Sequence, residues 1–258
     1  MEWFVVVVGC LLSGALIGFS GGMLGIGGGL LAIPLLGLVL GMDQQLAQGT
    51  ALIMVLPAVL LTVRKYHQRA KIDLRAAAAG AVSSIVFTWV GAQIALGLDP
   101  LLLRQVYAVF ILGIAIFYFY QGLRRRDPAK PVAPRRDASE FHKGWFVLMG
   151  VMAGMAGGIF GVGGAVLAVP FMTTFFRLSQ IGAQGLGLMM VIPGTFVGLL
   201  TYASHGQVDW LVGVPLALGS IVFVPYGVKF AYGLPEPRLK TFFACMLLVV
   251  ICLLLIKA

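Results

Sequence analysis

Charged residues are scarce in this sequence, and their scarcity excludes a soluble protein. Only 10% of the 258 residues are charged, whereas 60% are apolar and the mean hydropathy is +1.01. Soluble domains usually carry about a quarter charged residues. The 18 basic and 9 acidic residues therefore cannot cover a soluble surface of this size. The composition predicts a polytopic membrane protein.

Cysteine is also scarce, and no metal-binding or nucleotide-binding motif accompanies it. There is no CxxC pair, no cluster of His and Cys, and no GxxxxGK[ST] phosphate-binding loop. The three cysteines lie within apolar runs, where they are typical of small core residues: Cys10, Cys245 and Cys252. Because the apolar segments also contain no nucleophile–base pair, we expect no cofactor, no metal and no enzymatic activity.

Acidic residues are absent from the interior of the apolar segments. All nine fall in loops or at segment ends: Glu2, Asp43, Asp73, Asp99, Asp127, Asp137, Glu140, Asp209 and Glu236. Proton and sodium carriers usually bury a carboxylate in the membrane, where it is costly and functional. The pattern therefore favours an anionic substrate, moved alone or with an ion that the sequence does not locate.

Basic residues give a net charge of +9, but they are confined to short segments between apolar runs. Five lie between Arg64 and Arg75, and seven lie between Arg124 and Lys143. The positive-inside rule explains this distribution, so we expect no nucleic-acid partner. With both segments in the cytoplasm, the chain termini are predicted to lie outside.

The chain is a tandem duplication. Shifted by 136 residues, it aligns with itself without a gap from about residue 12 to residue 120. The glycine-rich run 21–29 falls on 157–165, Gln48 falls on Gln184, and Asp73 falls on Asp209. Random apolar similarity would not keep glycine, glutamine and aspartate in register. We therefore predict a first membrane repeat at 1–122, a cytoplasmic basic linker at 123–143 and a second membrane repeat at 144–258.

Each repeat contains five apolar segments, which predict an all-α fold. They span roughly 3–20, 29–41, 45–63, 76–97 and 104–122, and then 144–156, 165–176, 181–200, 210–230 and 239–256. Segments of about 20 residues can cross a bilayer as helices, but the second of each repeat is too short. We predict glycine-broken re-entrant or half-helices at these positions. An odd number of crossings in each half then makes the two repeats inverted in topology.

The glycine-rich breaks are the leading candidates for a substrate site. Inverted-repeat transporters often bind substrate where the N-termini of broken helices meet near the membrane midplane, and such N-termini attract anions. The candidate residues are Gly25, Gly27, Gly28, Gly29, Gly161, Gly163 and Gly164. Spaced glycines such as Gly14 and Gly18 are more typical of helix packing. The dense clusters before the two short helices favour a binding site.

Three further residues are weaker candidates for substrate binding. Gln48 and Gln184 open the third segment of each repeat, and Thr50 follows Gln48 in the first. A glutamine amide can donate to an oxyanion, although a helix-end residue in the headgroup region is an equal alternative. Asp73 and Asp209 are most simply N-caps of the fourth segments.

The sequence resembles the TauE/SafE family of membrane transporters, also called the sulfite exporter family. The paired glycine motifs, the sequence Gln48-Gly49-Thr50 and the basic central linker carry the resemblance. It implies transport of sulfite, sulfoacetate or other organosulfonates across the bacterial inner membrane. The second repeat departs from the first at Ala165, in place of Gly29, and at Leu186, in place of Thr50. We therefore expect the two halves to contribute unequally to the site.

These observations predict a secondary transporter for small sulfur-containing anions, embedded in the lipid bilayer. An anion channel or a uniporter for a different small anion is the alternative, because no coupling carboxylate is visible. The sequence leaves open whether the protein forms a homodimer.

Overall fold

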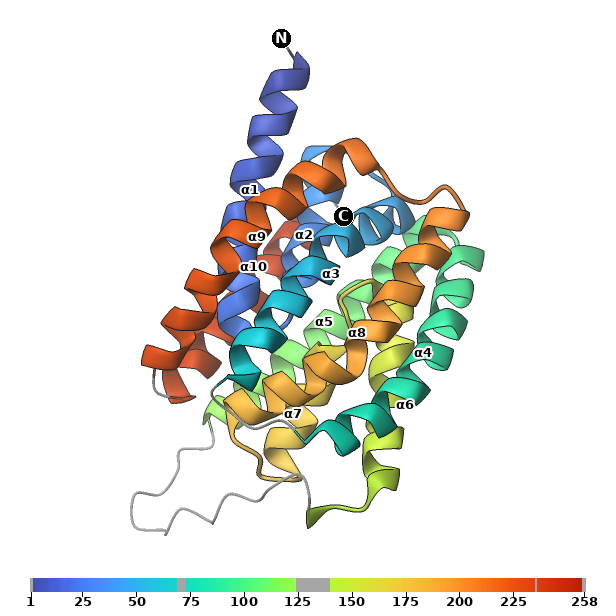
Figure 1. The fold of residues 1–258 in the computed structure, drawn as a ribbon. Helices are drawn as coiled ribbons and strands as arrows, with labels where there is room; N and C mark the ends of the chain where they lie inside the picture. Colours follow the sequence, from blue (N-terminus) through green and yellow to red (C-terminus); the bar gives the residue numbers. More distant parts are fainter. Residues whose placement is uncertain (1, 69–72, 124–139, 235, 257–258) are drawn as a thin grey trace.

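The computed structural model of the protein describes residues 2–68, 73–123, 140–234 and 236–256, and within them all regular structure is helical (Figure 1). The helices are α1 (Glu2–Leu24), α2 (Gly29–Val39), α3 (Gln44–His67), α4 (Leu74–Gly97), α5 (Pro100–Leu123), α6 (Lys143–Phe160), α7 (Ala165–Thr174), α8 (Gln180–Ser204), α9 (Trp210–Gly233) and α10 (Glu236–Ile256). The all-α prediction is confirmed.

Seven of these helices are long and apolar enough to cross a membrane: α1, α3, α4, α5, α6, α8 and α9. The second helix of each half is much shorter, with 11 residues in α2 and 10 in α7. At 1.5 Å per residue, such a helix extends about 16 Å, which is half of a bilayer core of roughly 30 Å. The predicted half-helices are therefore confirmed, and the chain is a multi-pass membrane protein.

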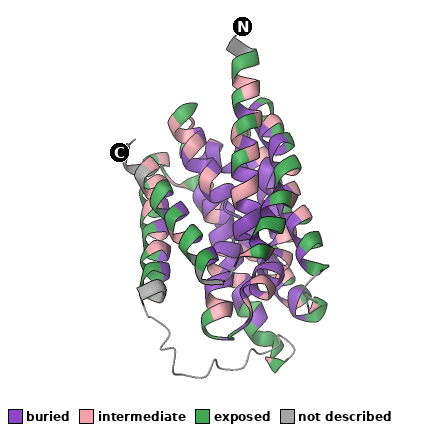
Figure 2. Ribbon diagram, turned by 90° about the vertical axis from the view of Figure 1, so that its left-hand side faces the viewer, coloured by how far each residue is buried: buried purple, intermediate pink, exposed green. Residues whose placement is uncertain are grey.

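The two halves of the chain are interlocked. The most extensive packing joins α1 to α9 and α4 to α6. Since α6 is the repeat equivalent of α1, and α9 of α4, each half packs its first helix on the fourth helix of the other half. The third helices, α3 and α8, pack on each other between these pairs. They are the most buried of the long helices, and Figure 2 shows the buried residues concentrated in the middle of the bundle.

Spaced glycines allow these close helix contacts. A Cβ atom on Gly18 of α1 would lie 2.5 Å from Cα of Ser220 in α9, and one on Gly154 of α6 would lie 2.9 Å from Cα of Ser84 in α4. Gly14 meets the backbone of Leu216 in the same way. These glycines have no room for a side chain, so they serve the packing role that their spacing predicts.

The fourth helices begin at the two predicted N-caps. The carboxylate of Asp73 accepts hydrogen bonds from the N–H groups of Arg75, at 2.9 Å, and Ala76, at 3.2 Å. That of Asp209 accepts from Leu211, at 2.9 Å, and Val212, at 3.2 Å. Both caps satisfy N–H groups that the first helical turn leaves without a partner.

The opposite orientation of the two repeats across the bilayer stays a prediction. The linker at 123–143, which is predicted to separate the repeats, falls largely outside the described residues. In a variant lacking the native cysteines, we expect a cysteine at Ser204 to react with a membrane-impermeant thiol reagent added to intact cells. A cysteine at Pro131, which also lies outside the described residues, should react only after the membrane is opened, because the positive-inside rule predicts that the basic linker is cytoplasmic. Labelling at both positions, or at Pro131 alone, would overturn the predicted topology.

Candidate functional site

Two glycine-rich breaks separate each first helix from the half-helix that follows it. In the first break, Gly25, Gly27 and Gly28 have φ angles of 66°, 74° and 82°. In the second, the equivalent residues Gly161, Gly163 and Gly164 have φ angles of 66°, 72° and 67°. Residues with a Cβ atom rarely adopt this left-handed conformation, whereas glycine does so at little cost. The two breaks therefore repeat one backbone conformation that depends on glycine.

This conformation leaves backbone N–H groups without a backbone acceptor. Among the described residues, the N–H groups of Gly27, Gly28 and Gly29 have no backbone acceptor. The N–H groups of Gly163 and Gly164 have none either. The residues that precede the half-helices are glycines, so no side chain caps the N-terminus of α2 or α7. Each terminus thus presents donors and the positive end of a helix dipole, an arrangement suited to an anion.

The two breaks meet beside Val55, in the middle of α3. A Cβ atom on Gly29 would lie 3.1 Å from the carbonyl oxygen of Gly161 and 2.9 Å from Cγ2 of Val55. The Cγ1 atom of Val55 would lie 3.1 Å from a Cβ on Gly27 and 3.3 Å from one on Gly163. The structure therefore brings all seven candidate glycines into one central region, with donors from both halves of the chain.

Each of the two candidate glutamines lies against the break of the opposite half. A Cβ atom on Gly25 would lie 2.8 Å from Cδ of Gln184, and one on Gly161 would lie 2.9 Å from Cβ of Gln48. Both glutamines are almost completely buried, with 0% of Gln48 and 1% of Gln184 exposed. They lie inside the bundle, packed against the glycine-rich breaks.

The hydrogen bonds of these glutamines differ. The side-chain N–H₂ of Gln184 donates to the carbonyl oxygen of Leu24, at 2.6 Å. In Gln48 the side-chain oxygen lies 2.8 Å from the hydroxyl of Tyr202, which donates either to it or to the carbonyl oxygen of Gly158. The N–H₂ group of Gln48 has no partner. Of these two glutamines, Gln48 thus keeps its whole amino group available as a buried donor, whereas Gln184 keeps only its side-chain oxygen without a partner.

Thr50 has a different environment from the breaks. Its hydroxyl oxygen accepts a hydrogen bond from the backbone N–H of Asp209, at 2.9 Å, at the start of α9. None of the contacts described for Thr50 reaches the candidate glycines, so we assign it a structural role in positioning α9.

Two residues that lie beside the breaks, Val55 and Thr195, were not predicted from the sequence. A Cβ atom on Gly163 would lie 3.8 Å from the hydroxyl oxygen of Thr195.

The central region is buried in the bundle. All residues of the two breaks are buried, as are Val55, Gln48 and Gln184. A solute can reach them only if the helices around them move. In this structure the candidate site is therefore buried.

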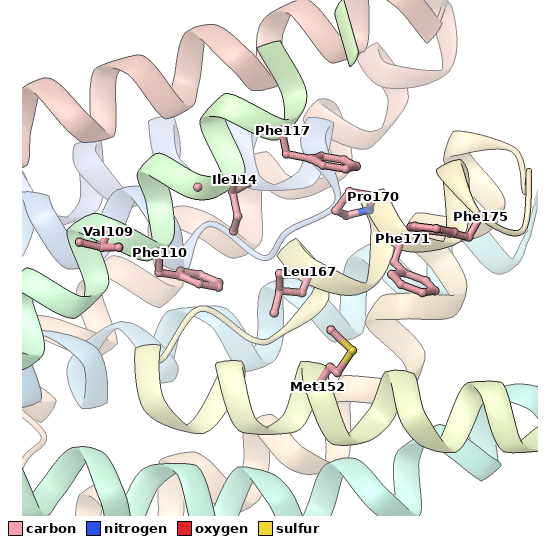
Figure 3. Close-up of a pocket in the computed structure, with 10 residues that line it drawn as sticks. Val109, Phe110, Ile114, Phe117, Met152, Leu167, Pro170, Phe171 and Phe175 are labelled. Atoms are coloured by element: carbon pink, nitrogen blue, oxygen red, sulfur yellow. The ribbon is translucent and has the colours of Figure 1, made fainter. Parts of the chain in front are cut away.

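A groove between α5, α6 and α7 is chemically unsuited to an anion (Figure 3). Its volume is about 360 Å³, and its ten lining residues, which include Phe110, Phe117, Leu167 and Phe171, are all apolar. A charged group without donors would pay a large desolvation penalty there. The groove belongs to the apolar periphery of the bundle, which is suited to lipid chains.

Comparisons with known proteins agree with this architecture. The sequence model of the family described as "Sulfite exporter TauE/SafE" matches residues 10–254. A probable membrane transporter protein of Xylella fastidiosa is 30% identical over 225 residues, covering 86% of this chain and 82% of the relative. The probable membrane transporter protein YunE of Bacillus subtilis is 21% identical, with 85% of each chain covered. A probable membrane transporter protein of Methanocaldococcus jannaschii is 23% identical, covering 71% of this chain and 67% of the relative.

Proposed function

The chain belongs to the TauE/SafE sulfite exporter family of membrane transporters, and from this premise we propose that it is a secondary transporter of small sulfur-containing anions. Sulfite, sulfoacetate and other organosulfonates are the substrates we expect it to carry across the cell membrane. The description of the family supports the sulfur chemistry, and the names of the relatives support transport.

The convergence of the two glycine-rich breaks is the observation on which the proposal rests. Sulfite and sulfonate groups carry several oxygen atoms, each of which accepts hydrogen bonds. The breaks supply backbone N–H donors from two helix N-termini, and Gln48 adds a side-chain N–H₂ group that has no partner. In a buried site such fixed donors interact with an anion more strongly than they would in water. The site can therefore offset the cost of removing the anion from water.

The origin of the donors in both halves of the chain supports a carrier over a channel. A channel needs a continuous path when open, whereas a carrier exposes its site to one side at a time. Here the donors come from two interlocked halves, so a movement of one half against the other would open the region towards one face of the membrane. This is the general plan of transporters built from inverted repeats.

The distribution of acids also supports an anionic substrate. Among the described residues, the acidic side chains lie in loops or at helix ends, as those of Asp73 and Asp209 do at their N-caps. The middle of each described helix therefore has no carboxylate that would repel an anion.

Equilibrium binding to the purified protein in detergent tests the proposed substrate class. We expect saturable binding of at least one member of a panel of sulfite, thiosulfate, sulfoacetate and taurine, with sulfate and chloride for comparison. Organic cations of similar size serve as a control, because a site made of donors should not retain them. If a monodisperse preparation binds none of the sulfur compounds, the proposed substrate class is wrong.

A further inference from the structure

A tyrosine near the end of α8, Tyr202, contacts the side-chain amide of Gln48. Its hydroxyl oxygen lies 2.8 Å from Oε1 of Gln48 and 3.0 Å from the carbonyl oxygen of Gly158. The side chains of Tyr202 and Gln48 are both completely buried. Two oxygen atoms lie this close when a proton is shared between them, and an amide oxygen carries no proton. The shorter contact is therefore a hydrogen bond that Tyr202 donates to Gln48.

This hydrogen bond fixes the direction in which the amide faces. The oxygen and the N–H₂ group of an amide lie on opposite sides of one carbon atom, so holding the oxygen against Tyr202 turns the N–H₂ group away from it. That N–H₂ group has no partner, and the side chain that carries it lies against the break, 2.9 Å from the position of a Cβ atom on Gly161. Buried polar groups are nearly always paired, so an unpaired donor indicates an additional group that binds there.

The other half of the chain shows the same amide without such a bond. Tyr66 and Gln184 occupy the positions equivalent to this pair. The hydroxyl of Tyr66 donates to the carbonyl oxygen of Gly22, at 3.1 Å, but the side-chain oxygen of Gln184 has no partner. Its N–H₂ group instead donates to the carbonyl oxygen of Leu24, at 2.6 Å. An amide that no tyrosine holds thus uses its donor within the protein.

Gln48 has the same type of acceptor beside it. The repeat equivalent of Leu24 is Phe160, which immediately precedes Gly161. Among the described residues, no backbone N–H donates to the carbonyl oxygen of Phe160. If the amide of Gln48 rotated as that of Gln184 has done, its N–H₂ group would donate to this oxygen and would no longer be available to a substrate.

We propose that Tyr202 is a positioning residue of the anion site, which holds the side-chain oxygen of Gln48 and thereby directs its N–H₂ group to the substrate; this rests on the proposed function. An anion that accepts from the N–H₂ group makes the amide oxygen more negative and a better acceptor. The two hydrogen bonds of the amide therefore strengthen each other. Tyr66 has no such role, because its hydroxyl bonds to the backbone and not to Gln184.

Tyr202→Phe and Tyr66→Phe form a matched pair that tests this role. Each removes one buried hydroxyl and keeps the ring that fills the space. We expect Tyr202→Phe to lower the affinity for the sulfur anion by about tenfold and Tyr66→Phe to leave it unchanged. The melting temperature should fall at least as far in Tyr66→Phe, because only Gln48 can rotate to a new acceptor. Equal losses of affinity in the two variants would overturn the proposal.

A double-mutant cycle shows whether Tyr202 acts through Gln48. In a Gln48→Leu background the amide is gone, so Tyr202→Phe should lower the affinity by less than about twofold. A purely structural effect of the hydroxyl would persist in that background. A tenfold loss with and without Gln48 would therefore contradict a positioning role.

Thermal unfolding of the same four proteins without any anion separates this proposal from the proposed function. A bond between Tyr202 and Gln48 predicts that their effects on the melting temperature are not additive. Non-additive effects in a protein that binds no sulfur anion support the bond that orients Gln48 and contradict the proposed function. Unchanged affinity in Tyr202→Phe, in a protein that does bind the anion, contradicts the positioning role and leaves the anion transporter intact.

Discussion

Replacing Gly163 with alanine is expected to weaken anion binding by roughly fivefold to 150-fold, the effect of losing one buried hydrogen bond worth about 1–3 kcal/mol. The new Cβ atom would lie 3.3 Å from Cγ1 of Val55 and 3.8 Å from the hydroxyl oxygen of Thr195, so it fits with small adjustments. It would nevertheless cover the backbone N–H groups of the break. Gly163→Val, and the equivalent Gly27→Val, should abolish binding altogether. Titration of sulfite and sulfoacetate against the purified variants measures the change.

Gly41→Ala is the matched control for this substitution. Gly41 has a φ of 68°, close to the 72° of Gly163, but a Cβ atom on it would meet nothing within 4 Å. Both variants therefore carry the same backbone strain, about 1–2 kcal/mol for an L-residue in the left-handed region. Gly41→Ala should keep full affinity despite a lower melting temperature, and Gly14→Val should mainly lower stability. If Gly163→Ala also binds like the wild type, the breaks are packing elements and the anion binds elsewhere.

Replacing Gln48 with leucine is expected to weaken anion binding and to stabilise the empty protein. The unpartnered N–H₂ group is a buried donor, and such a group costs about 1–3 kcal/mol while it remains unsatisfied. Leucine removes this cost together with the donor. The hydroxyl of Tyr202, which lies within hydrogen-bond distance of Gln48, can still donate to the carbonyl oxygen of Gly158, at 3.0 Å. We therefore expect a higher melting temperature and an affinity about tenfold or more lower.

Gln184→Leu should behave differently at the equivalent position. Its N–H₂ group bonds to the carbonyl oxygen of Leu24, so the substitution leaves that acceptor without a donor, while it removes the side-chain oxygen of Gln184, which has no partner. These two effects oppose each other, so the melting temperature should be lower than that of Gln48→Leu, and the loss of affinity should be smaller. Thermal unfolding and anion titration of the two variants, side by side, provide both measurements. Equal behaviour of the pair would contradict the assignment of Gln48 as the substrate donor.

The sequence was sufficient to predict the helices, the half-helices and the glycine breaks. Membrane helices need long apolar runs, and the 136-residue repeat kept the glycines of the two breaks and the aspartates of the two N-caps in register. Each of these features depends on local chemistry: a positive φ for glycine, or a carboxylate that accepts from the next turn. Such local requirements can be recognised in a single sequence, without an alignment of related sequences.

The contacts between the halves could not be predicted in the same way. That Gln184 lies against Gly25, and Gln48 against Gly161, follows from how the two repeats interlock. The difference between the two amides arises from their side-chain conformations, which the repeat does not encode. Thr50 was expected near the substrate, but its hydroxyl oxygen accepts a hydrogen bond from the backbone N–H of Asp209, at the start of α9. Val55 and Thr195 resemble ordinary helix residues until the packing places them beside the breaks.

Counterflow of radioactive sulfite, or of whichever sulfur anion binds most tightly, into liposomes tests the central claim most directly. The account predicts saturable accumulation of the labelled anion when unlabelled anion is trapped inside, no unitary currents in planar bilayers, and no accumulation by Gly163→Val. Rapid, non-saturable flux with resolvable single-channel currents would contradict a carrier. Undiminished counterflow by a folded Gly163→Val protein would contradict a substrate site at the glycine-rich breaks.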